Sequence, residues 1–116
     1  NYAHTSAPLW SMEQTNGDAA SGVTFPSAYG STGTKPTTGT WTHLVGVYDS
    51  SDSGIKLYVN GSLAGSGTNT SAWSASGPLT IGRALYAGKN TDQLPGSVAN
   101  VQVYPRTLSA TEVTSL

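Results

Sequence analysis

The chain has 116 residues, of which 9% are charged, and its formal net charge is −1. This length suits a single domain with its own core, and the 5 scattered basic residues exclude the clustered Lys and Arg that nucleic acid or an anionic membrane requires. Cysteine is absent, so no disulfide or thiolate metal site can form within the chain. No run approaches the roughly 20 apolar residues of a membrane span. A composition rich in Gly, Ser and Thr with few charges is typical of secreted bacterial β-proteins, so we expect an extracellular protein.

The first forty residues predict short strands only. Two apolar islands, residues 8–12 and 22–25, are separated by Gly, Asn, Ser and Pro. Islands of this length allow only short strands. Residues 34–40 contain Pro and Gly and show no periodicity, which indicates an exposed loop.

The strongest strand pattern follows this loop. Residues 41–49 are rich in β-branched and aromatic side chains, which predicts a buried strand with Trp41 in the core and His43 packed or hydrogen-bonded within the strand. The polar run at residues 49–54 predicts a hairpin loop, in which Asp49 and Asp52 form local hydrogen bonds.

A second hairpin is predicted directly afterwards. Ile55, Leu57 and Val59 alternate with other residues, which places the three aliphatic side chains on one face of a strand. Asn60-Gly61 suits a two-residue type I′ turn, because both residues tolerate positive φ, and residues 62–64 then form the returning strand. The same letters begin an N-glycosylation sequon, as do Asn69-Thr70-Ser71, and turn chemistry explains the first sequon most simply.

The remainder of the chain predicts two more strands and a helical turn. The strands are expected at residues 79–82 and 98–104, on either side of a long loop at residues 86–96. Ser109 and Glu112 have the S-x-x-E spacing of a capping box, so a short helical turn through Val113 is expected. The pattern predicts an all-β antiparallel sandwich or barrel as a single domain over residues 1–116.

From Trp41 onward, the order of these segments resembles the laminin G-like, concanavalin A-like jelly roll of secreted actinobacterial proteins. The resemblance rests on residues 41–49, 55–61, 77–83, 94–104 and 106–113. It implies a jelly-roll sandwich that binds carbohydrate or tethers a larger protein. Members usually carry acidic residues in the last strand, and this chain departs from that pattern with Ala99 and Asn100.

The strands that begin this family's fold have no counterpart before the Trp10 region. An open jelly roll leaves an unpaired edge and an uncovered apolar face, and both are costly in water. We therefore expect the first strands to come from another segment of the polypeptide or from a partner chain.

Catalysis is not expected from the acidic residues. A glycosidase needs two carboxylates held across its substrate, and the chain has 6 acidic residues, of which Glu112 is assigned to the cap and Asp49 and Asp52 to a turn. The E-x-D-x-x-E signature of the related glucanases is absent, and His4 has no acidic neighbour. The sequence therefore favours a non-catalytic module.

Calcium is the metal that the resemblance implies. The oxygen-rich loops 16–18 and 90–92 supply Asp18 and Asp92 as candidate ligands. Asn and Asp are also ordinary turn formers, and this second interpretation of both loops stays open.

The candidate sugar site lies in the loops at one end of the sandwich. Aromatic faces stack on sugars while amide, carboxylate and guanidinium groups bond their hydroxyls, and the residues that offer these groups are Trp73, Tyr86, Arg83, Asn90 and Asp92. Trp73 could instead cap the sandwich edge, and Arg83 could pair with Asp92. The expected function is a carbohydrate-binding module of a larger secreted protein, and the alternative is a structural module that docks onto another chain or domain.

Overall fold

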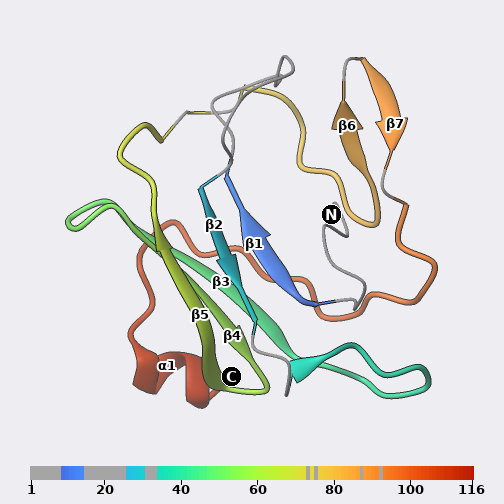
Figure 1. Cartoon of the computed structure of the whole chain (residues 1–116), viewed down its shortest axis with the longest axis horizontal. Coiled ribbons are helices and arrows are strands. Elements are labelled where there is room, and N and C mark those ends of the chain that lie inside the picture. Colours follow the sequence, from blue (N-terminus) through green and yellow to red (C-terminus); the bar gives the residue numbers. More distant parts are fainter. Residues whose placement is uncertain are drawn as a thin grey trace.

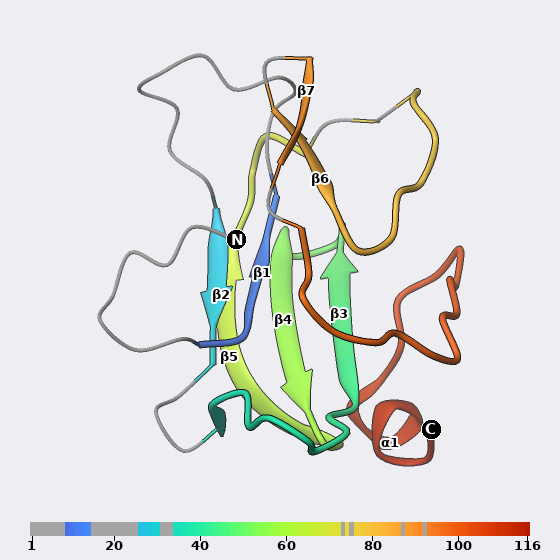
Figure 2. The same ribbon diagram turned by 90° about the vertical axis from the view of Figure 1, so that its right-hand side faces the viewer.

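The computed structural model describes residues 9–14, 26–30, 34–72, 74, 76–86, 88–91 and 93–116, and only the backbone of Leu85 and Tyr86. Its elements, labelled in Figure 1, are β1 (Ser11–Glu13), β2 (Ser27–Tyr29), β3 (Leu44–Asp49), β4 (Gly54–Val59), β5 (Ser62–Thr68), β6 (Ala84–Tyr86), β7 (Lys89–Thr91) and α1 (Ala110–Thr114). The strands form the sheets β1-β2, β3-β4-β5 and β6-β7, and every pair is antiparallel. The prediction of an all-β antiparallel sandwich with one short helical turn is confirmed. Figures 1 and 2 show α1 and the β6–β7 hairpin at opposite ends of the molecule.

The central sheet is the predicted three-stranded meander. Asn60 and Gly61 have φ of 51° and 78°, as a type I′ turn requires, and Val59 pairs with Ser62 across it. In the preceding turn, Asp49 Oδ1 accepts hydrogen bonds from the backbone N–H and the hydroxyl of Ser51. Asp52 Oδ1 likewise accepts from the Gly54 N–H at 2.7 Å. Both aspartates therefore stabilise the hairpin loop, as predicted.

Strand β4 is buried on both of its faces. Successive side chains of a strand point to opposite faces, and the two sets of β4 enter different clusters. One, here called the Ile55 cluster, consists of Ala28, Ile55, Leu57 and Val59, with Trp10, Met12, Tyr48 and Ala64 against it. The other, here called the Val113 cluster, consists of Val47, Tyr58, Leu108 and Val113, with Val45 and Tyr104 against it. The β1–β2 hairpin thus covers one face of the sheet, and the C-terminal segment covers the other.

Two glycines of β5 allow β2 to approach the central sheet closely. Gly65 and Gly67 pair with Leu57 and Ile55, so they lie on the face that carries the Ile55 cluster. A Cβ at Gly65 would lie 2.0 Å from the carbonyl oxygen of Tyr29, and one at Gly67 would lie 2.2 Å from that of Ser27. No side chain fits at these distances. The two layers can pack at their observed separation only because both positions are glycine.

The third strand is shorter than predicted, and Trp41 is not in the core. Strand β3 begins at Leu44, which pairs with Val59, the last residue of β4. Residues 41–43 extend beyond the end of β4 and have no strand partner in that register, so Trp41 is 70% exposed. The side chain of His43 is exposed and its backbone is bonded to Asn60, so the prediction that His43 is packed within a strand is wrong, while the predicted hydrogen bonding is present.

Neither of the last two predicted strands forms. At residues 79–82 the chain bends, because Gly82 has φ 78° and its carbonyl accepts the Leu94 N–H at 2.8 Å. Pairing occurs instead between β6, which ends at the first residue of the predicted loop, and β7, which lies within that loop. Residues 98–104 are irregular, since Asn100 has φ 53°, which interrupts an extended run.

Large apolar side chains are exposed in these two irregular segments and in the chain between them. Those about half exposed or more are Leu79, Ile81, Leu94, Val98, Val101 and Val103. The sheet order also leaves β3 at an edge of the central sheet. These features agree with the expectation that another segment completes the sandwich, which stays a prediction.

The glycine contact between β2 and β5 is tested by Gly65→Ala. The added methyl group would overlap the backbone of Tyr29, so we expect a loss of roughly 1–3 kcal/mol in the free energy of unfolding, measured by denaturant titration. Gly77→Ala is the matched control, because nothing lies within 4 Å of a Cβ at Gly77. Equal stability of the two variants would contradict the close approach.

Candidate functional site

A cavity of about 250 Å³ lies between the chain before β1, the segment that joins β2 to β3, and the turn after β4. Its volume is near the lower end of small-molecule pockets, which occupy roughly 300–1,000 Å³. It therefore has room for a ligand of the size of one sugar residue rather than a long chain. The described residues that line it are Trp10, Thr34, Lys35, Thr37, Thr40, Thr42, Val59 and Asn60.

Trp10 connects the cavity to the core. Its ring packs against the Ile55 cluster, and its carbonyl oxygen accepts the Gly30 N–H at 2.8 Å, which fixes it beside β2. Its Nε1 is buried and has no hydrogen-bond acceptor among the described residues. A buried donor without a partner costs about 1–3 kcal/mol, so such groups are rare and call for an explanation.

Threonine hydroxyls form one wall of the cavity. Residues 34–42 contain five threonines, and Thr34, Thr37, Thr40 and Thr42 contribute to the lining. The segment folds back through a hydrogen bond from the Thr40 N–H to the Thr37 carbonyl, with Gly39 at φ 78° inside the turn. Trp41 lies between two lining threonines but is itself outside the lining, as the alternation of extended chain predicts.

Asn60 anchors this wall to the end of β4. Its backbone N–H donates to the His43 carbonyl at 2.8 Å, and its Oδ1 accepts the His43 N–H at 3.0 Å. The side-chain carbonyl is thus used by the fold. The Nδ2 of Asn60 has no partner among the described residues, which leaves a donor beside the cavity.

The two sequons have different surroundings. Asn69 is 2% exposed, its Nδ2 donates to Gln14 Oε1 at 2.8 Å, and its Oδ1 accepts the Ser71 N–H. Its nitrogen is therefore occupied in the folded protein, where it joins β5 to the end of β1. Asn60 is exposed in its turn.

Of the loop residues predicted to bind sugar, the structure brings together Arg83 and Asn90. The guanidinium of Arg83, just before β6, donates from Nη1 to Oδ1 of Asn90 in β7. Tyr86 ends β6. Trp73 and Asp92 lie outside the described residues, so the predicted five-residue set stays a prediction.

The predicted calcium ligands, Asp18 and Asp92, also lie outside the described residues. Within the part of the chain that the structure describes, no three His, Cys, Asp or Glu side chains gather where they could hold a metal ion. The described residues also contain no helix long and apolar enough to cross a membrane.

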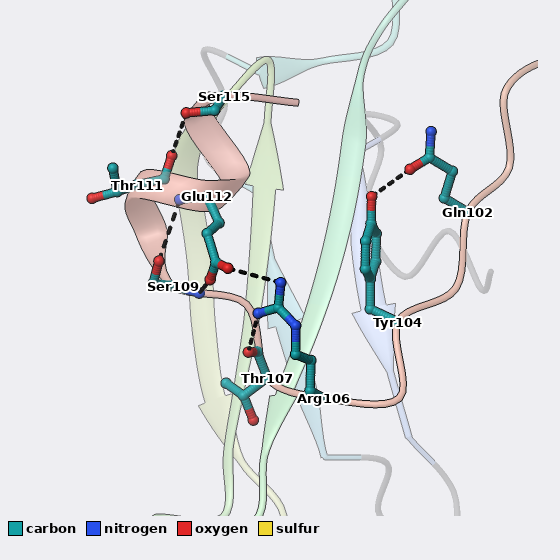
Figure 3. Close-up of polar contacts among 8 residues, drawn as sticks. All are labelled: Gln102, Tyr104, Arg106, Thr107, Ser109, Thr111, Glu112 and Ser115. Carbon is teal, nitrogen blue, oxygen red and sulfur yellow. Dashed lines mark hydrogen bonds and ion pairs between the residues drawn. The ribbon is translucent and has the colours of Figure 1, made fainter.

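Among the residues that the structure describes, the largest pKa shift belongs to the C-terminal cap shown in Figure 3. Arg106 Nη2 lies 2.8 Å from Glu112 Oε1, and the Ser109 N–H donates to Glu112 Oε2 at 2.8 Å. The Glu112 N–H donates in return to Ser109 Oγ at 3.3 Å, which completes the predicted capping box. Chiefly through Arg106, and then through Ser109, these contacts lower the pKa of Glu112 to about 2 from 4.5.

Hydrogen bonds from Ser51 similarly lower the pKa of Asp49. Both shifts are explained by local structure and indicate no acid or base for catalysis.

Sequence reasoning did not find the cavity. Residues 34–40 were correctly predicted as a loop without a strand, but the repeated threonines were not interpreted as a lining. The threonine density beside Lys35 is the signal that could have suggested a polar site. Trp10 gave no such signal, because only the fold brings it to this loop.

One comparison with known proteins identifies the chain's relatives. Residues 5–114 match the family model Laminin_G_3, described as the concanavalin A-like lectin/glucanases superfamily. This match covers most of the chain and confirms the resemblance seen in the sequence. Comparisons with curated proteins and with solved structures gave no significant match.

The cap makes stability depend on pH. Because the pKa of Glu112 is lower when folded than its ordinary 4.5, the cap's stabilisation is complete above about 4.5 and is lost as pH falls to about 2. We expect the melting temperature of the wild type to fall more steeply over this range than that of Glu112→Gln or Arg106→Gln. Parallel pH profiles in thermal melts of all three proteins would contradict this assignment.

Proposed function

The chain belongs to the concanavalin A-like lectin/glucanases superfamily, and from this premise we propose that it is a non-catalytic module of a larger secreted protein that binds carbohydrate in the cavity beside Trp10. One observation carries the proposal. A buried indole N–H without an acceptor belongs to a residue that lines a cavity with several hydroxyl groups. That N–H is covered in this structure, so a sugar oxygen would satisfy it once the indole or the groups over it move.

The chemistry of the lining supports a sugar in particular. Sugar sites combine an aromatic surface with a few polar groups that fix orientation. Here the aromatic residue is Trp10, the aliphatic contact is Val59, and the polar groups come from Asn60, Lys35 and the threonines. A purely apolar ligand would remove water from the Lys35 ammonium and the Asn60 amide without replacing its hydrogen bonds, which costs free energy.

The proposal of a binding rather than a hydrolytic role rests on the lining as well. Glycoside hydrolysis uses two carboxylates on either side of the scissile bond. The described residues that line the cavity include no Asp or Glu. The superfamily description covers both lectins and glucanases, so membership supports either role, and the lining favours the lectin.

A second candidate function is docking onto another chain or domain. The observation that favours it is the exposure of six large apolar side chains, those of Leu79, Ile81, Leu94, Val98, Val101 and Val103. Exposed apolar patches often mark interaction sites. The two functions are compatible, because a module can dock through one surface and bind sugar in another.

Trp10→Phe tests the proposed sugar site. Phenylalanine keeps an aromatic ring against the Ile55 cluster but removes the Nε1 donor. Glycans that bind the wild type are first found on an array. We expect the variant to bind them about fivefold more weakly, because one hydrogen bond of about 1 kcal/mol is lost. Affinities are measured by isothermal titration calorimetry. Thermal melts establish that the variant is folded.

Trp41→Phe is the matched control, since Trp41 is exposed and does not line the cavity. Arg83→Gln tests the loop site in parallel. Binding that survives Trp10→Phe but is lost in Arg83→Gln would move the site to the β6–β7 hairpin.

Absence of any glycan signal, with a partner chain bound through the exposed apolar residues between 79 and 103, would favour the docking role. Should Trp10→Phe fail to fold, Thr40→Val removes a lining hydroxyl and replaces it in the test.

A further inference from the structure

The fixed polar groups of the cavity are mostly donors. The ammonium group of Lys35 can only donate, and so can the indole Nε1 of Trp10, which is covered in this structure. Among the described residues of the lining, the one side-chain amide is that of Asn60, and its acceptor oxygen is bound to the His43 N–H, so its Nδ2 donor remains. Threonine hydroxyls can act either way. Among these side chains, the exposed groups that can only donate are the Lys35 ammonium and the Asn60 Nδ2, and a ligand with acceptor oxygens would complement both.

The charge of the cavity also favours a ligand with negatively charged acceptor atoms. Lys35 is the charged residue in the described lining, and it forms no ion pair with any described residue. The carboxylates that the structure describes are engaged elsewhere, with Asp49 and Asp52 in the β3–β4 turn and Glu112 in the cap. Glu13 accepts a hydrogen bond from the Tyr29 hydroxyl at 3.4 Å. The positive charge of Lys35 is thus left for a ligand.

We propose that the cavity selects acidic sugars, in which a carboxylate replaces the exocyclic hydroxymethyl group, and that Lys35 is the residue that discriminates them from neutral sugars. This inference rests on the proposed carbohydrate-binding function. A carboxylate has only acceptor oxygens when ionised, so it complements the donor groups of Lys35 and Asn60 and supplies the counter-charge for Lys35. A neutral hexose has a hydroxyl at that position, which offers a donor of its own and no charge.

The expected selectivity is modest because Lys35 is exposed. An exposed ion pair is weakened by water and by salt, with screening over about 8 Å at physiological ionic strength. We therefore expect a uronic acid to bind about fivefold more tightly than its neutral counterpart at low salt. The preference should shrink as sodium chloride is raised toward 1 M, while binding of the neutral sugar should change little.

The experiment compares matched ligands on the intact chain. Methyl glucuronide, its carboxyl methyl ester and methyl glucoside share one ring and differ in charge, and the galactose series repeats the comparison. Glucose 6-sulfate distinguishes recognition of a carboxylate from recognition of any anion. Affinities are measured by calorimetry or by ligand-observed NMR. We expect the uronic acid to bind more tightly than the ester, the neutral glycoside and the sulfate.

Variants then assign the selectivity to Lys35. Lys35→Gln should bring the affinity for the uronic acid down to that for the neutral glycoside, and Lys35→Arg should retain the preference. Lys89→Gln, which removes an exposed lysine on β7 outside the cavity, should behave as wild type.

Equal affinity for acid, ester and neutral sugar, or equal affinity for the sulfate, would overturn the selectivity and leave the carbohydrate-binding function standing. Loss of selectivity in Lys89→Gln rather than in Lys35→Gln would overturn the role of Lys35. Failure of every saccharide to bind would reject both proposals.

Discussion

Both halves of the core depend on the alternation of side chains along a single strand, β4. Ile55, Leu57 and Val59 enter the cluster beneath the β1–β2 hairpin, while Tyr58 enters the cluster beneath the C-terminal segment. A shift of one residue in register would exchange the two sets, since the period of a strand is two residues. The Asn60-Gly61 turn prevents such a register shift at the C-terminal end of β4. At the N-terminal end of β4, the hydrogen bonds of Asp49 and Asp52 shape the preceding turn. The register of β4 therefore positions every layer packed on it.

The cavity is a consequence of where β4 ends. Val59 is the last residue of the strand and lines the cavity, and Asn60, directly after it, ties residues 40–43 to the sheet through two hydrogen bonds with His43. Trp10 reaches the same place because it precedes β1 and packs on the Ile55 cluster. The residue that closes the hairpin thus also organises the site. A turn that sequence reasoning treated as scaffold therefore also borders the cavity, since its side chain fixes one wall through the His43 N–H.

Local chemistry was predictable and long-range packing was not. The type I′ turn at Asn60-Gly61, the capping box of Ser109 and Glu112 and the alternation along β4 follow from interactions between near neighbours, so the sequence contains all that determines them.

The position of Trp41 was mispredicted because its exposure depends on the length of a different strand, β4, which ends opposite Leu44. Strands were wrongly predicted at residues 79–82 and 98–104 because a β-branched pattern is only a propensity, and a strand also needs a partner. Gly82 and Asn100, both at positive φ, show where the backbone departs from extended structure. The lining of the cavity joins three segments that are distant in sequence, so no single stretch could reveal it.

The central claim is that a sugar binds against Trp10 at the end of β4, and a crystal structure of the chain with a bound uronic acid tests it most directly. The account predicts that the sugar occupies the cavity between Trp10 and residues 34–42, with one of its oxygens about 3 Å from Trp10 Nε1 and its carboxylate beside Lys35. A sugar bound instead at the β6–β7 hairpin, with Trp10 Nε1 still without an acceptor, would contradict it.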